Sequence, residues 1–249
     1  MISSMSAAPE QAQPLTTRPS SEPVCIKCRG QEGEFYRDEK GYEYWRDCEC
    51  VKRKKAERLM HSSNITEEFQ SKSFGTFEKE DLHPDVSTAH DLAYEYTKNF
   101  LNIRKSRMNS IALLGQPGCG KTHLLMAVSN NLIKRGIEVI YFPWVEGWTE
   151  ICEDYKLMPE RVRRLQRAEV LFIDDVYKGR DEPTKTQREQ FFAIVNYRYM
   201  ENLPMLISSE RTIAEMCQFD EAVGSRINEM CRDYKAIINK NMELNRRLK

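Results

Sequence analysis

Apolar residues alternate along most of the chain between short continuous runs and longer stretches with helical spacing. From about Ser73 onward, apolar runs lie at 111–114, 137–142, 170–173 and 205–207, and the segments between them carry apolar residues at intervals typical of helices. Short apolar runs that end in polar residues are typical of buried strands, and strands that alternate with helices form a parallel sheet. The pattern predicts an α/β fold with a parallel sheet flanked by helices.

Two of the predicted helices have a well-defined apolar face. Asp85 is expected to cap a helix from Val86 to about Arg104, and a second helix is expected from about Pro183 to Tyr199. The residues that recur at helical spacing are Ala89, Leu92, Ala93, Tyr96, Phe100 and Ile103 in the first helix and Phe191, Val195 and Tyr199 in the second. We expect the face of the second helix to lie in the core.

The N-terminal part of the chain has a different composition. Residues 1–22 are rich in Ser, Ala, Pro, Gln and Thr and offer few apolar side chains for burial. Such a segment cannot offset the conformational entropy that folding would cost. We expect a disordered lead, with order beginning at Cys25.

Four of the eight cysteines form two close pairs, Cys25 with Cys28 and Cys48 with Cys50. In a reducing compartment, two pairs separated by a short loop favour a tetrahedral Zn²⁺ with four thiolate ligands over disulfides. The second pair has the C-x-C spacing instead of the commoner C-x₂-C, so unliganded thiols, or His61 as a competing ligand, remain alternatives. Four protein ligands leave no open position, so the metal is expected to be structural.

Aromatic and basic residues surround these cysteines. Between the pairs lie Phe35, Tyr36, Tyr42, Tyr44 and Trp45. These rings are either presented on the knuckle or form its own small core, and the second is the simpler interpretation. The basic run 51–59 follows with the character of a helix. It either meets phosphates or an acidic partner surface, or it is a solvated linker helix.

The most specific motif is Gly-Gln-Pro-Gly-Cys-Gly-Lys-Thr at residues 115–122, a complete GxxxxGK[ST] phosphate loop between a predicted strand and a predicted helix. Its backbone N–H groups can surround a polyphosphate, Lys121 can reach the β- and γ-phosphate oxygens, and Thr122 can ligate Mg²⁺. The residues expected to bind the nucleotide ATP are Gly115, Gln116, Pro117, Gly118, Cys119, Gly120, Lys121, Thr122 and His123.

The predicted strand 170–175 ends in two carboxylates, as a Walker B motif does. An acidic residue at the carboxyl end of a buried parallel strand beside a phosphate loop is placed to hold Mg²⁺, and the next acid can orient the attacking water. We assign Asp174 to the metal and Asp175 to the water.

Composition adds limits. The 38 basic and 38 acidic residues cancel, so any contact with nucleic acid must come from local patches. No run approaches the about 18 apolar residues of a membrane span, and residues 1–23 lack the apolar region of a signal peptide. We expect a cytoplasmic protein without a membrane partner.

The order of these motifs, with a polar strand end and then Gly224-Ser225-Arg226, resembles the bacterial helicase loaders of the DnaC/DnaI type, a branch of the AAA+ ATPases. The resemblance spans roughly residues 74–234. Its most specific pieces are residues 173–175, 206–210 and 224–226. With the cysteine knuckle ahead of it, the chain is most similar to the zinc-bearing loaders and their phage relatives.

The resemblance implies further roles. The sensor of the γ-phosphate would be Ser209, or Ser208, and Arg226 is similar to an arginine finger that reaches the nucleotide of a neighbouring subunit. A helix-surface arginine without a role is the alternative for Arg226. The Asp-Asp ending departs from the usual Asp-Glu of AAA+ ATPases, and the shorter Asp175 implies slow, regulated hydrolysis.

Loaders also insert a helical element after the second strand that contacts single-stranded DNA. Here that region is 144–156, followed by several arginines, and aromatic rings with cations suit stacking on bases and binding of the backbone. The DNA-binding candidates are Trp148, Lys156, Arg163, Arg164 and Arg167. The same residues are equally compatible with a solvated basic face over an apolar stripe formed by Leu157, Val162 and Leu165.

The expected architecture is a P-loop AAA+ core at 73–249, preceded by the disordered lead at 1–22, a zinc-binding knuckle with its basic helix at 23–60 and a linker at 61–72. Residues 235–249 are too few for the helical lid of many AAA+ proteins, so a short or absent lid and an ATP-dependent homo-oligomer are expected.

The resemblance implies an ATP-dependent loader that binds a hexameric replicative helicase and single-stranded DNA and releases the helicase on hydrolysis, with ATP, Mg²⁺ and Zn²⁺. The alternative is a transposition helper ATPase of the same branch, which binds duplex DNA and a transposase. A small-molecule kinase is disfavoured because no acceptor pocket or basic lid is evident. An adaptor with a dead ATP site is disfavoured because Lys121, Thr122 and Asp174 are all present.

Overall fold

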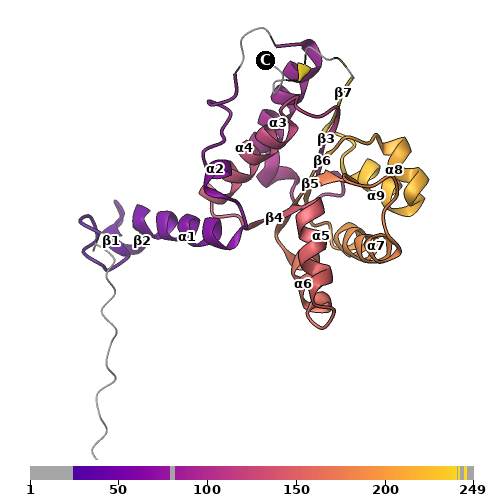
Figure 1. The fold of residues 1–249 in the computed structure, drawn as a ribbon. Coiled ribbons are helices and arrows are strands. Elements are labelled where there is room, and N and C mark those ends of the chain that lie inside the picture. Colours follow the sequence, from indigo (N-terminus) through magenta and orange to yellow (C-terminus); the bar gives the residue numbers. More distant parts are fainter. Residues whose placement is uncertain (1–24, 79–81, 240, 242–243, 246–249) are drawn as a thin grey trace, which may run out of the picture. The chain divides into compact units, whose positions relative to one another are not determined.

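The computed structural model describes residues 25–78, 82–239, 241 and 244–245 (Figure 1). The predicted disordered lead, residues 1–22, lies outside the described residues. The chain divides into two compact units between Cys50 and Val51. Helix α1, Glu49–Ser62, crosses this boundary, and it contains the basic segment that the sequence predicted to be helical.

The smaller unit contains an antiparallel hairpin of β1, Gly33–Arg37, and β2, Glu43–Asp47. The carboxylate of Asp38 accepts hydrogen bonds from the backbone N–H groups of Lys40 and Tyr42, both at 2.9 Å, which fixes the turn. The aromatic pairs Phe35–Trp45 and Tyr36–Tyr44 face each other across the strands. All five hairpin aromatics are exposed, so the expectation that they form a small core is wrong. A two-stranded hairpin has no second layer to cover its faces.

The segment between the cysteine knuckle and the AAA+ core belongs to the larger unit. It contains a short helix α2, Glu67–Gln70, and the buried side chain of Ile65. The buried amide of Asn130 donates hydrogen bonds to the carbonyls of Phe69, Gln70 and Lys72. Residues 61–72, expected as a linker, are therefore attached to the same helix that follows the phosphate loop.

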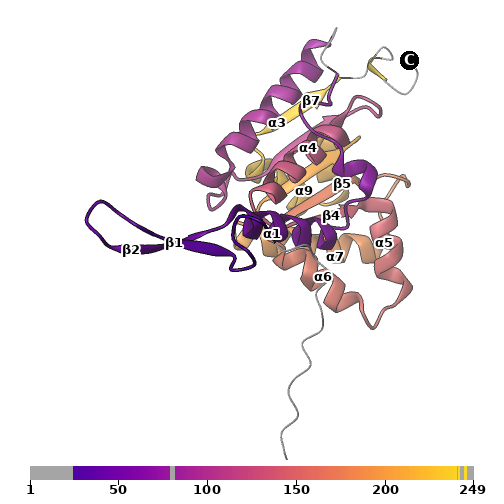
Figure 2. The ribbon, with the colours of Figure 1, turned by 90° about the vertical axis from the view of Figure 1, so that its left-hand side faces the viewer.

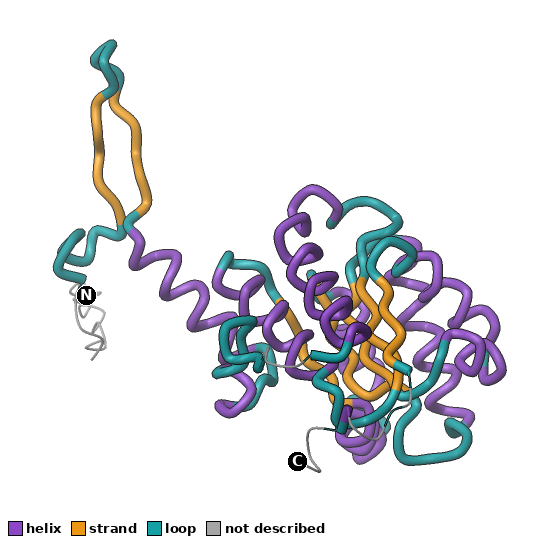
Figure 3. Tube along the Cα trace, turned by 90° about the horizontal axis from the view of Figure 1, so that it is seen from above, coloured by secondary structure: helices purple, strands orange, loops and turns teal. Residues whose placement is uncertain are grey.

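The larger unit contains a parallel five-stranded sheet in the order β4-β5-β6-β3-β7, with helices on both sides (Figure 3). The strands are β3, Ile111–Gly115; β4, Val139–Pro143; β5, Val170–Val176; β6, Met205–Ser209; and β7, Lys235–Ile238. The carboxyl ends of parallel strands meet at one edge, and the crevice at that edge is the usual ligand site of such sheets.

In the described part of the larger unit, seven helices besides α1 and α2 cover the two faces of the sheet. On one side lie α3, Pro84–Ile103, and α4, Lys121–Lys134, and α3 lies beside β7 (Figure 2). Helices α7, α8 and α9 lie on the other side in Figure 1. The helices packed on that side are α5, Trp144–Glu153; α6, Met158–Arg167; α7, Lys185–Met200; α8, Ile213–Phe219; and α9, Glu221–Met230.

Strand alternation explains the two layers of the core. In β3, Ile111 and Leu113 pack with α3 and α4, whereas Ala112 and Leu114 pack with the helices of the opposite face. Successive strand side chains point to opposite faces of a sheet, so a strand that is apolar throughout requires cover on both sides. The predicted fold class, a P-loop AAA+ core with a parallel sheet flanked by helices, is confirmed.

Several element ends differ from the prediction. Helix α3 begins at Pro84, and its N-cap is His83, whose side chain accepts a hydrogen bond from the Asp85 N–H. Asp85 is therefore not the cap; its carboxylate accepts from the backbone and side-chain amide of Asn239. Strand β4 starts two residues later than expected, at Val139, and helix α7 starts at Lys185 behind a capping box formed by Thr184 and Gln187.

The segment after β7 and the hydropathy of the helices bear on the expected lid and on membrane spanning. Among the residues described after β7 there is no α-helix. In the described part of the chain, every helix is too short or too polar to cross a bilayer.

Candidate nucleotide site and candidate zinc centre

Three strand ends bring the predicted site together. In the register of the sheet, Leu114 of β3 lies beside Ser209 of β6, and Ser209 lies beside Val176 of β5. Gly115, Asp174 and Ser208 are therefore near the same edge, where the phosphate loop enters α4. The sequence predicted this meeting from the order of the motifs.

The phosphate loop has the backbone that its glycines permit. Gly115 and Gly120 have φ values of +124° and +98°. A Cβ on Gly115 would lie 2.0 Å from the carbonyl oxygen of Ile238 in β7, and one on Gly120 would lie 2.7 Å from the ring of Phe77. Glycine is required here both for the turn and for the close approach of neighbouring segments.

Lys121 lies inside this loop. Its side chain is buried, and Nζ donates hydrogen bonds to the carbonyl oxygens of Gly115 at 2.8 Å and Gln116 at 2.7 Å. The ammonium group is thus held at the N-terminus of α4, where backbone N–H groups also favour negative charge.

Two other segments lie against the loop. The ring of His123 contacts Phe77 at a centroid distance of 5.1 Å, and His123 Nε2 lies 3.1 Å from the carbonyl oxygen of Ser73. On the other side, the Gln116 amide exchanges two hydrogen bonds of 2.6 Å with the backbone of Asn241. These contacts extend the candidate site beyond the motif, and nothing in the sequence spacing indicates them.

Asp174 is the central carboxylate of the site. Oδ1 accepts hydrogen bonds from Thr122 Oγ1 at 2.9 Å and from the hydroxyl of Ser208, and Oδ2 accepts from Tyr141 at 3.1 Å. Burial raises the pKa of Asp174 above its ordinary value, and the Ser208 hydroxyl bond opposes that shift. Burial also raises the pKa of Tyr141, so its phenol stays protonated and donates.

The pair Thr122 and Asp174 fits a divalent cation. A hydroxyl and a carboxylate oxygen 2.9 Å apart are the hard oxygen donors that Mg²⁺ prefers. Both residues were predicted as magnesium ligands, and the structure places them side by side. Tyr141 was not predicted, although its position on β4, next to the strand that carries Asp174, was a usable signal.

Asp175 has a different environment. The strand pairing shifts between Ile173 and Val176, Asp175 takes a left-handed φ of +57°, and its N–H donates to Ser208 Oγ at 2.7 Å. Its Oδ2 lies 2.7 Å from Lys178 Nζ, which also lies 3.3 Å from Glu210 Oε1. Lys178 and Glu210 were not among the predicted site residues.

The two serines of β6 have separate positions. Ser208 donates to Asp174, whereas Ser209 donates to the carbonyl oxygen of Val176 at 2.7 Å and accepts from the N–H of Arg211 at 3.0 Å. Adjacent residues of a strand point to opposite faces, so only one of the two can face α4. The preferred candidate, Ser209, is thus replaced by the alternative, Ser208, as the serine nearest the metal ligands.

Arg226 lies on α9 and packs on its own chain. Its Nη1 donates to the carbonyl oxygen of Ala222 at 2.8 Å, and its guanidinium lies 5.5 Å from the ring centre of Phe192 and 5.3 Å from that of Tyr199. The side chain is half-buried between α7 and α9 rather than part of the hydrogen-bond network at the strand ends.

The DNA-binding candidates separate into two groups. Trp148 is 2% exposed, and its ring packs on Phe142 and Trp144, so its prediction as a stacking platform is wrong for this conformation. The candidate cations, all exposed, are Lys156, Arg163, Arg164 and Arg167. Arg164 also donates to the carbonyl oxygen of Ser62 at 2.8 Å. Val162 and Leu165 are buried as expected, but Leu157 is exposed and does not belong to that stripe.

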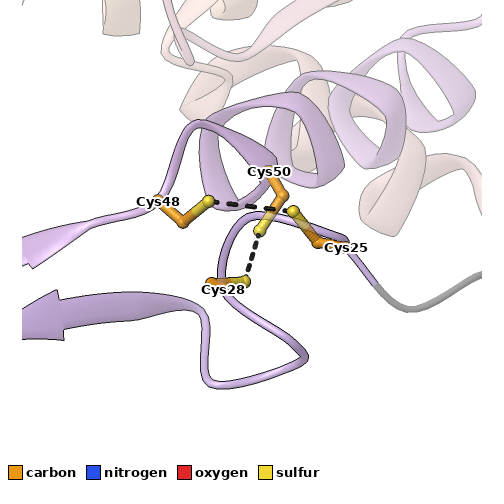
Figure 4. Close-up of side chains that lie close together, drawn as sticks. All are labelled: Cys25, Cys28, Cys48 and Cys50. Carbon is orange, nitrogen blue, oxygen red and sulfur yellow. Dashed lines mark hydrogen bonds between the residues drawn. The ribbon is translucent and has the colours of Figure 1, made fainter.

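The four predicted cysteines form one cluster in the smaller unit (Figure 4). The Sγ atoms of Cys25 and Cys48 are 3.9 Å apart, those of Cys28 and Cys50 are 3.5 Å apart, and all four lie within 4.8 Å of one another. Four thiolates bound to one Zn²⁺ at ~2.3 Å lie about 3.8 Å apart, so the donor set fits zinc. Among the described residues, His61 is not part of this cluster.

Two further observations bear on the cluster. All eight cysteines of the chain are free thiols in the structure. The backbone N–H groups of Cys28 and Lys27 lower the pKa of Cys25 to about 6, which favours the thiolate that a metal requires, whereas burial raises the pKa of Cys50 to about 12.

Comparison with known proteins relates the chain to replication ATPases. The family model "Bacterial DnaA ATPase domain" matches residues 85–231. Two proteins of Bacillus subtilis (strain 168) are similar over most of the chain. YqaM is 48% identical over 210 residues, which are 82% of this chain and 67% of YqaM. The phage-like element PBSX protein XkdC is 43% identical over 229 residues, which are 90% of this chain and 86% of XkdC.

Solved structures show the same fold. A crystal structure of DnaI superposes with a TM-score of 0.58 and 23% identity, over 71% of this chain and 94% of DnaI. The DnaC helicase loader superposes with a TM-score of 0.55 and 19% identity, over 71% of this chain and all of that structure. The resemblance to the DnaC/DnaI-type loaders of the AAA+ branch, predicted from the motifs, is confirmed.

Proposed function

Since the chain belongs to the bacterial DnaA ATPase domain family, we propose that it is an ATP-dependent helicase loader of DNA replication. The observation that carries the proposal is the contact between Thr122 and Asp174 beside the buried Lys121, in a chain with the fold of DnaI and DnaC. A phosphate loop and a Walker B carboxylate in contact are the parts that bind and use a nucleoside triphosphate.

In this proposal ATP is bound at the carboxyl edge of the sheet. The loop N–H groups from residues 115–120 and the Lys121 ammonium hold the phosphates. Thr122 and Asp174 hold Mg²⁺, which neutralises charge on the phosphate oxygens. Ser208 positions Asp174 through their hydrogen bond, and it is the residue proposed to sense the γ-phosphate.

Asp175 is the residue proposed to orient the attacking water. An Asp at this position is one methylene shorter than the Glu of most AAA+ ATPases, and here its carboxylate is also engaged by Lys178. Both features support slow hydrolysis, as expected of an ATPase that times an assembly step.

The smaller unit is proposed to bind the hexameric replicative helicase, with Zn²⁺ held by the four cysteines. Its exposed aromatic rings offer a contact surface rich in the residue types that dominate protein interfaces. Residues 25–50 carry seven acidic and five basic side chains, which favours a protein partner over the backbone of DNA.

Single-stranded DNA is assigned to the exposed cations of the α5–α6 region, Lys156, Arg163, Arg164 and Arg167. The contact is proposed to be with the phosphates, because Trp148 is buried. ATP-dependent self-association is proposed because Arg226, the candidate arginine finger, packs on Phe192 and Tyr199 apart from the site of its own chain and would complete the site of a neighbouring subunit.

The proposal is tested by mixing the purified protein with the replicative helicase and measuring the mass of the complexes with and without ATP. A joint assembly that depends on ATP in the wild type and is lost in Lys121→Ala supports a loader. No association under any nucleotide condition, combined with ATP-dependent binding of duplex DNA, would instead support a transposition helper.

A further inference from the structure

The turn after β5 carries a set of ion pairs that the proposed function leaves unexplained. Asp175 and Tyr177 both take left-handed backbone conformations, with φ values of +57° and +63°, and the N–H of Lys178 donates to the carbonyl oxygen of Asp175 at 3.0 Å. Left-handed φ values are uncommon for residues other than glycine and tend to occur at functional sites. This tight turn brings the side chain of Lys178 back onto Asp175.

Lys178 bridges the carboxylates of two strand ends. Its Nζ lies 2.7 Å from Asp175 Oδ2, near the end of β5, and 3.3 Å from Glu210 Oε1, directly after β6. The side chains of Lys178, Asp175 and Glu210 are 37%, 27% and 34% exposed. The pairs are thus shielded in part from water, yet open enough to exchange partners.

The ammonium stays charged in this position. Partial burial acts to lower the pKa of Lys178, but the hydrogen bonds and negative charges of Asp175 and Glu210 together outweigh it, so that the pKa lies above its ordinary value. A permanently charged Lys178 occupies the Asp175 oxygen Oδ2. A carboxylate oxygen held in an ion pair is less available to a water molecule.

We propose that Lys178 is a positioning residue that holds Asp175 in a resting arrangement, and that Glu210 is the second anchor to which Lys178 transfers when Asp175 orients the attacking water. This inference rests on the proposed function, because it assigns the regulation of that same site. Transfer between two carboxylates keeps the ammonium paired throughout, so the exchange does not require an unpaired charge in a partly buried site.

The arrangement makes the two partners of Lys178 act in opposite directions. Lys178→Met frees Asp175 and should raise the maximal rate of ATP hydrolysis about fivefold, the ratio that corresponds to one partly exposed ion pair. Glu210→Gln removes the second anchor, leaves Lys178 on Asp175 and should lower that rate by a similar factor. The double variant should behave like Lys178→Met, because Glu210 acts only through Lys178.

The experiment measures the hydrolysis rate at saturating ATP, the affinity for a fluorescent ATP analogue and the melting temperature of each variant. Lys178→Arg keeps the charge and should stay near the wild-type rate. Lys185→Met removes an exposed lysine that pairs with Glu189 on α7 and is the matched control without effect. The proposed ion pair that holds Asp175 at rest is called the latch. Unchanged ATP affinity in all these variants distinguishes an effect of the latch from a loss of folding.

Opposite rate changes in the two single variants, with the double variant as fast as Lys178→Met, support the latch. Equal or parallel changes in Lys178→Met and Glu210→Gln, in a wild type whose hydrolysis is abolished by Lys121→Ala, overturn the latch and leave the proposed function standing. A wild type that hydrolyses no ATP, alone or with helicase and single-stranded DNA, overturns the proposed function itself.

Discussion

Asp174 combines two properties that normally conflict: its side chain is 6% exposed, and holding Mg²⁺ in the proposed site requires it to be ionised. Three hydroxyl donors, from Thr122, Ser208 and Tyr141, offset part of the cost of desolvation. The raised pKa shows that the compensation is incomplete. A buried carboxylate with a perturbed pKa is expected at a site that binds a ligand, because the bound ligand can offset the free-energy cost of burying the charge.

Asp174→Asn should therefore stabilise the nucleotide-free protein while abolishing Mg²⁺-dependent ATP use. The neutral amide removes the cost of charge burial, with an expected gain of roughly 1 kcal/mol, or about 2–4 °C in melting temperature. Because the folded-state pKa is raised, the wild-type penalty develops above the unfolded value of 3.8, and the difference should shrink as the pH falls toward it. Asp175→Asn, at a more exposed carboxylate, is the control without a gain; an equal gain there would refute the explanation.

Lys121 and Asp175 have different proposed roles, so their substitutions should have different effects. Lys121→Ala should lose ATP binding, because it removes the side-chain cation aimed at the β- and γ-phosphates. Asp175→Asn should retain binding and lose hydrolysis, because an amide orients water poorly. Titration with a fluorescent nucleotide and a phosphate-release assay separate the two effects. Equal loss of binding in both variants would show that Asp175 does not have the role of orienting water.

For single residues, the sequence predicted which residue types form the site better than it predicted which way their side chains point. Lys121, Thr122 and Asp174 follow from motif spacing, because the loop geometry requires those residue types. The choice between Ser208 and Ser209 depends on which face of β6 meets α4, and a strand that is buried on both faces gives no sign of it. Lys178 was missed because its contact with Asp175 depends on the left-handed turn at Asp175 and Tyr177.

At the scale of elements, the positions of most sheet strands were predicted well, and the packing of the aromatic side chains outside the sheet was predicted less well. Apolar runs marked four of the five strands of the parallel sheet, whereas β7 was not predicted. Trp148 was assigned to a DNA-binding face because an aromatic residue near cations suggests stacking, yet the ring packs on Phe142 and Trp144. The aromatic rings of the hairpin show the opposite error, because they were predicted to form a small core and are exposed. Whether a ring is buried depends on which elements pack against it, and the sequence of the hairpin does not show that.

The cysteine cluster is the element with the sharpest metal prediction. Purified protein should contain about one zinc per chain, and Cys28→Ser should lose it while ATP binding is unchanged, because the cysteines belong to the smaller unit. Cys152→Ser, a half-buried cysteine of α5, is the matched control that should keep the metal. Metal analysis that finds no zinc in wild type prepared without chelator would contradict the assignment.

A second element-scale prediction concerns the attachment of residues 61–72 to α4. Asn130→Ala should destabilise the protein by about 1–3 kcal/mol, because the carbonyls of Phe69, Gln70 and Lys72 lose a shared buried donor. Asn131→Ala, the half-buried neighbour on α4, controls for the change in helix propensity. Amide hydrogen exchange should accelerate in 61–78 in the first variant only. Equal protection in both variants would show that the amide does not anchor this segment.

At the scale of the whole molecule, the chain contains most parts of an ATP site but keeps Arg226 away from that network. Arg226 packs on Phe192 and Tyr199 between α7 and α9. The two rings hold the half-buried guanidinium in a defined position. A residue that completes the site of a neighbouring subunit must be held in this way. We therefore expect Arg226 to act in trans.

Arg226→Ala alone should bind ATP and hydrolyse it poorly, because the transition state loses a cationic partner. Mixing this variant with Lys121→Ala is the stricter test. Each variant alone should hydrolyse little or no ATP, but some mixed interfaces join an intact phosphate loop from one chain to an intact arginine from the other. Those interfaces should recover part of the activity, provided that light scattering shows the two variants assembling together. A mixed assembly as inactive as its components would identify Arg226 as a packing residue of its own subunit, stacked on the rings of α7 and without a role in hydrolysis.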